Sequence, residues 1–249
     1  MKIKTPALIS AALLMYDFAI ATWAWIQLPS GAAVAVHWNV QGNPDGFAGT
    51  EALFLTPALA LGIAVLLALI PRIEPRRLNL TQSRKAYVAA WIAIMLMMSL
   101  VTTVVALNAV RRGAAAPSTW IPVGAGLLLI VVGNYLGKVR SNFFFGFRTP
   151  WTLSSELAWN KTHRLAARLF VAWGVLVLLT AFVKALAFLV FIGGAVIVLL
   201  GPVVYSYLVW RSDPAKVETG RHVTPALLES WSQMVDDRPA LKPEPQLAE

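Results

Sequence analysis

Long hydrophobic runs alternate with shorter polar stretches along most of the chain. Six runs are long enough, or nearly so, to cross a hydrocarbon core about 30 Å thick at about 1.5 Å of helix per residue. They cover residues 7–28, 52–70, 86–108, 119–137, 165–183 and 186–210. We therefore predict an all-α integral membrane protein with about six transmembrane helices, the last two joined by a tight turn at Lys184 and Ala185.

Lysine and arginine residues are distributed unevenly between the two sides that these spans create. One side collects 18 of them and the other only 3. The positive-inside rule makes the richer side cytoplasmic. We expect both termini in the cytoplasm and the loop 29–51 outside. The net charge of +9 is then topology-setting loop charge and does not call for direct nucleic-acid binding.

Composition supports a membrane protein. Hydrophobic residues make up 58% of the chain and charged residues 13%, against about 45–50% and about 25% in soluble domains. The absence of cysteine excludes disulfides, thiolate metal sites and a cysteine nucleophile.

Residues 33–35 resemble a signal-peptide cleavage site. However, the apolar run before them is longer than the signal core of about 7–15 residues, so we expect a retained span.

One acidic residue, Asp17, lies near the middle of the first predicted span. A carboxylate at that depth costs about 2.5–3.5 kcal/mol on insertion scales, so it should face protein or water. Two interpretations stay open: a proton or ligand site, or a carboxylic acid hydrogen-bonded to a neighbouring helix.

The outer loop 29–51 combines alternating apolar residues with turn residues, which predicts a short extended piece followed by a tight turn. It could bind a ligand outside the cell, or simply pack over the helix ends. It does not offer a complete set of metal ligands. The candidate residues are His37, Asn39, Gly42, Pro44, Asp45 and Gly46.

A polar and aromatic segment, residues 142–164, interrupts the hydrophobic pattern between spans four and five. Its aromatic run 142–147 is typical of the membrane interface, and Pro150 should break any helix. Thr152, Ser154 and Ser155 are possible N-caps for a short interfacial helix, with Glu156 in its first turn.

Helical spacing in this segment brings Glu156, Asn160, His163 and Arg164 near one face, with Trp159 beside it. An interfacial anchor explains the aromatic and cationic residues. It explains less well why these polar residues should cluster after a proline. Anchor and binding site both stay open from the residues alone.

Residues 133–164 resemble the signature of the SdpI-type immunity protein family. That pattern reads N-x-F-x-G-x-R-T-P-W-T-L-x-S, followed by a Trp and a T-H/N-R ending. The positions that fit it in order are Asn142, Phe144, Gly146, Arg148, Thr149, Pro150, Trp151, Thr152, Leu153, Ser155, Trp159 and Arg164, with Gly133-Asn134 upstream. The earlier residues 28–49 resemble the loop of a small domain of unknown function that often precedes this family. We call residues 133–164 the signature segment.

The resemblance implies a bacterial plasma-membrane protein that protects a toxin-producing cell from its own secreted peptide toxin. It also implies a receptor that holds a small repressor protein at the membrane. Beyond the lipid bilayer, the expected partners are thus the toxin outside and the repressor inside. No cofactor, metal or enzymatic activity is expected.

The signature segment is the predicted ligand- or partner-binding site. Within it, Arg148 could clamp a carboxylate or phosphate, while Trp151 and Trp159 would fix the helix at the interface. The candidate residues are Asn134, Asn142, Arg148, Thr149, Trp151, Thr152, Ser155, Glu156, Trp159, His163 and Arg164.

Two other classes of function have some support in the sequence. A small-molecule or proton-coupled transporter would use Asp17 and Glu156 as coupling groups. An enzyme would use His163 with Glu156, but these lie two helical turns, about 10 Å, apart, and no nucleophile or metal set accompanies them.

Three regions are predicted. Residues 1–75 form an N-terminal membrane domain, residues 76–210 an SdpI-like membrane domain and residues 211–249 a cytoplasmic tail that departs from the family pattern. In the tail, residues 224–235 suggest an amphipathic surface helix, and residues 238–249 are expected to be disordered.

Overall fold

The computed structural model describes residues 3–39, 41–111 and 113–216. Six of the described helices are long and apolar enough to cross a membrane, so the predicted all-α multi-pass architecture is confirmed. The predicted tail helix, residues 224–235, lies outside the described residues. The long helices are α1 (Lys4–Gln27), α2 (Leu55–Ile73), α4 (Arg84–Val110), α5 (Pro117–Leu136), α7 (Glu156–Thr180) and α8 (Lys184–Arg211).

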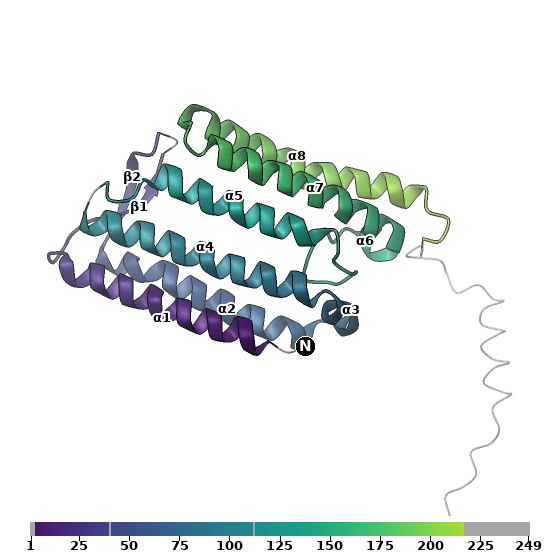
Figure 1. Ribbon diagram of the computed structural model, residues 1–249, viewed down its shortest axis with the longest axis horizontal. Coiled ribbons are helices and arrows are strands. Elements are labelled where there is room, and N and C mark those ends of the chain that lie inside the picture. Colours follow the sequence, from purple (N-terminus) through teal and green to yellow (C-terminus); the bar gives the residue numbers. More distant parts are fainter. Residues whose placement is uncertain (1–2, 40, 112, 217–249) are drawn as a thin grey trace, which may run out of the picture. The chain divides into compact units, whose positions relative to one another are not determined.

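The long helices pack as two groups of three. In the first group, α1, α2 and α4 share a core that includes Ala60, Leu80, Trp91 and Met95. In the second, α5, α7 and α8 pack around Trp173 and its neighbours. Helices α4 and α5 contact each other and join the groups (Figure 1).

Small residues let α5 and α7 approach closely. A Cβ placed on Gly126 would lie 2.9 Å from the carbonyl oxygen of Gly174, and one placed on Gly174 would lie 2.7 Å from that of Gly126. Small residues at a helix interface allow the close backbone packing that stabilises helix pairs in lipid. Gly126 precedes the signature segment in the sequence and Gly174 follows it, so this close contact brings together the two helices that flank the segment.

Short elements lie at the two ends of the spans. Between α1 and α2 the chain forms an antiparallel hairpin of β1 (Val34–Trp38) and β2 (Pro44–Ala48), followed by the 3-10 helix η1 (Thr50–Phe54). The predicted extended piece is therefore one strand of two. The short helices α3 (Arg77–Gln82) and α6 (Pro150–Ser154) precede α4 and α7.

Two boundaries differ from the sequence-based expectations. The turn between the last two spans occupies residues 181–183, so Lys184 begins α8 instead of lying in the turn. The segment from Glu156 to Arg164 is the first part of the transmembrane helix α7, whereas the sequence pattern predicts a separate interfacial helix. The separate short helix is α6, because Ser155 interrupts the helix with an extended backbone conformation.

Candidate functional site

The loop of the signature segment is organised by Asn142, whose side chain is fully buried. Its Oδ1 accepts hydrogen bonds from the backbone N–H groups of Phe144 (2.9 Å) and Phe145 (2.7 Å). Its Nδ2 donates to the carbonyl oxygens of Arg140 (2.9 Å) and Phe145 (3.1 Å). These four partners fix the orientation of the amide and close the loop on itself. Asn142 thus acts within the protein and does not reach an external ligand.

The turn between α2 and α3 interlocks with this loop. Glu74 is fully buried, and its carboxylate accepts from the backbone N–H groups of Arg76 (2.8 Å) and Phe143 (3.0 Å). Arg76 donates to the hydroxyl group of Ser141 and to the carbonyl oxygen of Leu153 (3.2 Å). Its guanidinium also lies 4.9 Å from the centroid of the Phe143 ring.

Two more hydrogen bonds fasten the same loop to the first helix group. Asn79 Nδ2 donates to the carbonyl oxygen of Ser141 (2.8 Å), and the backbone N–H of Arg140 donates to Ser83 Oγ (2.9 Å). Sequence reasoning missed this role, because residues 71–85 lie between two predicted spans and enter the sequence-based prediction only through their loop charges. The available signal was Glu74, the single acid among five cations in that loop.

His163 holds the second half of the loop. It is buried, and its Nε2 accepts from the backbone N–H of Phe147 at 3.0 Å. The ring proton must therefore lie on Nδ1, which donates to the carbonyl oxygen of Trp159 at 2.8 Å. Gly146 has φ +108°, and a Cβ there would overlap His163 Nε2. Only glycine suits this position.

Hydroxyl groups cap the two helices that follow. Thr149 and Thr152 form a reciprocal capping box at α6, in which each side chain accepts from the other residue's backbone N–H (3.0 and 3.1 Å). Ser155 Oγ caps α7 by accepting from the backbone N–H of Ala158 at 2.9 Å. Of the possible caps named from the sequence, Ser155 is the one that α7 uses.

Contacts of Ser155 and Trp151 connect the segment to α8 and to the residues after it. Ser155 donates its hydroxyl proton to Asp213 Oδ2 at 2.5 Å. This bond, with a second from the backbone N–H of Ala215, holds the pKa of the Asp213 carboxyl below its usual value. Trp151 packs edge-on against Tyr207 with 5.2 Å between ring centroids.

Phe143 is exposed, whereas the other aromatic residues of the segment are partly or fully buried, so together they do not form an interfacial strip. Phe144 packs against the core of the first helix group, and Phe145 packs with Trp159 and Ala86 of α4. Trp159 is fully buried and donates its indole N–H to the carbonyl oxygen of Val139 at 2.7 Å. The expectation that Trp159 anchors at the interface was wrong, because sequence spacing does not reveal which side of a helix meets protein.

The predicted common polar face on α7 does not form. His163 lies in the core, whereas Glu156 and Arg164 are exposed. The predicted cluster therefore lies partly on the packed side and partly on the exposed side of α7. His163 and Glu156, the two residues of the enzyme alternative, lie on different sides. Arg148 is exposed and donates to the carbonyl oxygen of Phe143 at 2.8 Å. Asn134 is exposed on α5.

At the other end of the spans, Asn39 organises the turn of the hairpin. Its Oδ1 accepts from the backbone N–H groups of Gln41 and Asn43, each at 3.0 Å. Gly42 supplies the positive φ of +82° that the turn needs. Asn39 and Gly42 therefore shape the loop.

His37 and Asp45 face each other across the two strands. Their side chains are exposed, and His37 Nδ1 lies 2.5 Å from Asp45 Oδ1. Gly46 pairs with His37, and a Cβ on Gly46 would lie 2.8 Å from His37 Cβ. The small residue at position 46 keeps the strands close enough for this pair.

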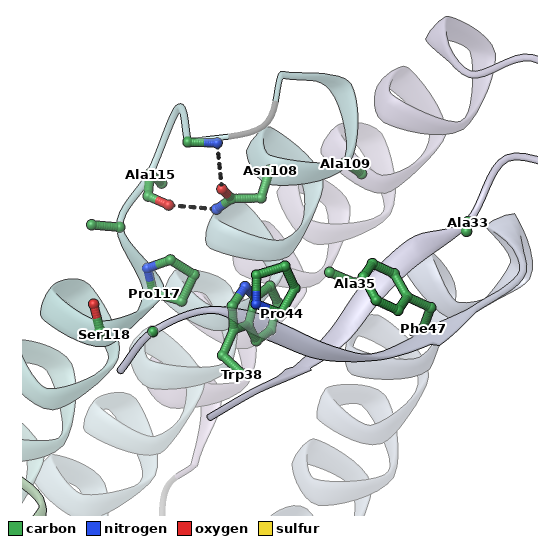
Figure 2. Close-up of a pocket in the computed structure, with 13 residues that line it drawn as sticks. Ala33, Ala35, Trp38, Pro44, Phe47, Asn108, Ala109, Ala115, Pro117 and Ser118 are labelled. Atoms are coloured by element: carbon green, nitrogen blue, oxygen red, sulfur yellow. Dashed lines mark hydrogen bonds between the residues drawn. The ribbon is translucent and has the colours of Figure 1, made fainter. Parts of the chain in front are cut away.

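An apolar cavity of about 350 Å³ lies between the hairpin and the connection from α4 to α5 (Figure 2). Asn108 closes one side of it, accepting from the backbone N–H of Gly113 and donating to the carbonyl oxygen of Ala115 (2.6 Å). A second cavity of about 360 Å³ shares Trp38 with the first and reaches His37 and Asn39. The side chains that give the first cavity its apolar character are Ala33, Ala35, Trp38, Pro44, Phe47 and Pro117.

Asp17 is fully buried within α1, away from both ends. Within residues 3–39, 41–111 and 113–216, no three His, Cys, Asp or Glu side chains come together in a way that could hold a metal ion.

Two stretches of the chain match known family models. Residues 138–206 match the model of the SdpI/YfhL protein family, and residues 12–61 match a domain of unknown function, DUF1648. Residues 138–206 thus carry the likeness to the SdpI/YfhL family. This range contains the interlocked loop, α6 and α7, and the DUF1648 range contains Asp17 and the hairpin.

A curated relative carries the same likeness. The chain is 36% identical over 62 residues to the Immunity protein SdpI of Bacillus subtilis (strain 168), which is 25% of this chain and 30% of that protein. The match thus spans less than a third of the relative's length. No solved structure matches the chain. The predicted boundary at residues 75 and 76 falls between the two family ranges and stays a prediction.

Proposed function

We propose that this chain is a multi-pass bacterial plasma-membrane immunity protein that protects the cell from a secreted peptide toxin. The observation that carries the proposal is the likeness of its SdpI/YfhL segment to the Immunity protein SdpI. The loop charges, 18 cations on one side against 3 on the other, favour cytoplasmic termini. In this orientation the hairpin lies outside the cell and the signature segment inside.

The outer hairpin is the proposed toxin-recognition region. Its cavities have apolar walls with a few polar groups at their edges, which is the usual make-up of a site for a partly apolar ligand. Trp38 lines both cavities and is the natural anchor for an apolar side chain of a peptide. His37 and Asp45 supply the polar group beside it.

The exposed part of the signature segment is the proposed surface for a cytoplasmic repressor. Its buried residues are already occupied by contacts within the protein, so a partner can reach only the exposed ones. These carry both charges and an aromatic ring, a combination suited to protein recognition. They include Arg140, Phe143, Arg148, Glu156 and Arg164.

Survival of a sensitive strain tests the proposal. The chain is expressed in Bacillus subtilis strain 168 from which its own SdpI has been removed, and the cells are exposed to medium conditioned by the parent strain. We expect survival comparable to that given by SdpI itself. Survival no better than with an empty vector, while the chain is present in the membrane fraction, would contradict the proposal.

Matched variants separate the two proposed surfaces. W38A should reduce protection, whereas W23A, which removes an exposed tryptophan from α1, should not. The double variant R148A/R164A should lose protection against the toxin. The control R84A, which removes an exposed arginine at the start of α4, should keep this protection. Full protection by both W38A and R148A/R164A would refute the assignment of these surfaces.

A further inference from the structure

A carboxyl group lies inside the first helix group without a partner. Asp17 is fully buried, and neither of its oxygens makes a hydrogen bond in the described part of the chain. It stands about 20 Å of helix from Lys4 and about 15 Å from Gln27, the two ends of α1. The group is therefore deep within the span, where water and lipid headgroups do not reach it.

A second unpaired group faces it from α4. The Ser99 hydroxyl lies next to the Asp17 carboxyl and is itself buried without a hydrogen bond. Two turns earlier on both helices, Trp91 Nε1 donates to Ser10 Oγ at 2.8 Å. Asp17 follows Ser10 by seven residues and Ser99 follows Trp91 by eight, so the two pairs lie on the same seam at successive levels.

No cation is placed to neutralise a charge on Asp17. Within residues 3–39, 41–111 and 113–216, the only close contact between a basic and an acidic side chain is that of His37 with Asp45, in the outer hairpin. The phenol groups on α1 and α4 are occupied, Tyr16 by Thr103 and Tyr87 by the carbonyl oxygen of Leu67. The other ionisable residues on α1 and on the elements packed against it lie at helix ends: Lys4, Glu51, Arg72, Arg84, Lys85 and, just after α4, Arg111.

We propose that Asp17 and Ser99 form an intramembrane proton-binding site. Asp17 is protonated at neutral pH and donates its O–H to Ser99 Oγ, which satisfies the acid and the hydroxyl together. The ionised form would leave a charge buried with one hydroxyl, that of Ser99, as its donor and no counter-ion, which is far more costly than a neutral, hydrogen-bonded acid.

The seam is too poor in oxygen ligands for a metal cation. Hard cations bound through oxygen take about six ligands or more. Asp17 and Ser99 offer three unpaired oxygens. The hydroxyl groups of Thr102 and Thr103 on the same helix donate to backbone carbonyls one turn earlier. The site thus fits a proton, and it does not depend on the immunity function proposed above.

Infrared spectroscopy of the full chain in lipid vesicles tests the site. At pH 8 exposed carboxyl groups are ionised, so a carboxylic acid C=O stretch reports a buried protonated acid. We expect this band in the wild type and its loss in D17N, whose neutral amide has nearly the same shape. Identical spectra of wild type and D17N in this region would show that Asp17 is ionised and would overturn the proposal.

Two further arms keep the test decisive if D17N fails to fold. In S99A the C=O band should still be present but at a different frequency, because the acid loses its hydrogen-bond acceptor. The control S10A should leave the frequency of the band unchanged. A band that does not move in S99A would contradict the pairing. Loss of the wild-type band in sodium chloride, but not in choline chloride, would reassign the site to sodium.

Discussion

Replacing Asn142 with aspartate keeps the shape of the side chain but removes both of its donors. In the wild type, Nδ2 donates to the carbonyl oxygens of Arg140 and Phe145, at 2.9 and 3.1 Å. In N142D, a carboxylate oxygen would face these two carbonyl oxygens in a fully buried position. The two hydrogen bonds accepted by Oδ1 are retained.

The expected loss follows from these contacts. Each buried carbonyl left without its donor costs about 1–3 kcal/mol, and the facing negative oxygens add repulsion. We therefore expect N142D to lower the free energy of unfolding by about 2–4 kcal/mol. Reversible unfolding in sodium dodecyl sulfate, followed by tryptophan fluorescence, measures this difference.

The matched control is N160D. Asn160 is half-buried on α7, and its carbonyl oxygen, not its side chain, accepts a hydrogen bond from Arg164. The same chemical change there should alter stability by less than about 0.5 kcal/mol. If N142D were as stable as N160D, the buried amide would not be what holds the signature loop in shape.

Two further predictions concern the same loop and its link to α8. G146A should destabilise the protein by about 2–4 kcal/mol in the same unfolding assay. An alanine must adopt an unfavourable positive φ and push His163 away from its backbone donor; stability equal to wild type would contradict this. The stabilisation from the Ser155–Asp213 bond should be complete above the ordinary aspartate pKa of 3.8 and disappear as the pH falls below it, because these bonds lower the pKa of the folded Asp213. Thermal melts of wild type and D213N should therefore converge in acid, and a constant difference between them down to pH 3 would refute the link.

The membrane spans could be predicted from the sequence because lipid imposes a simple requirement. A helix must be long and apolar to cross the bilayer, and hydropathy records this directly along the chain. The family likeness could also be recognised, because it rests on the order of residues between Asn142 and Arg164. Both predictions use information that is local in the sequence.

The interlock at the inner end could not be predicted in the same way. Glu74 accepts from the backbone of Phe143, 69 residues later, and no local pattern indicates such a contact. Helical spacing correctly placed Trp159 and His163 as neighbours on α7. It could not show that this side of the helix meets the core, since that depends on where α4 and the loop at Val139 lie.

Asp17 is an intermediate case. Its presence in an apolar span indicates a special environment from the sequence alone. Only the packing of α1 on α4 shows that its single polar neighbour with free hydrogen-bonding capacity is Ser99 within the described residues. The structure thereby identifies Asp17 and Ser99 as the pair of groups on which the two interpretations can be tested.

The functional account depends most directly on which end of the spans faces outward. The chain contains no cysteine, so single cysteines can be introduced without background. Asn43 in the hairpin and Lys161 on α7 are both exposed. With a membrane-impermeant maleimide, the account predicts labelling of N43C in intact cells and of K161C only after the membrane is opened. Labelling of K161C in intact cells, with N43C protected, would contradict it.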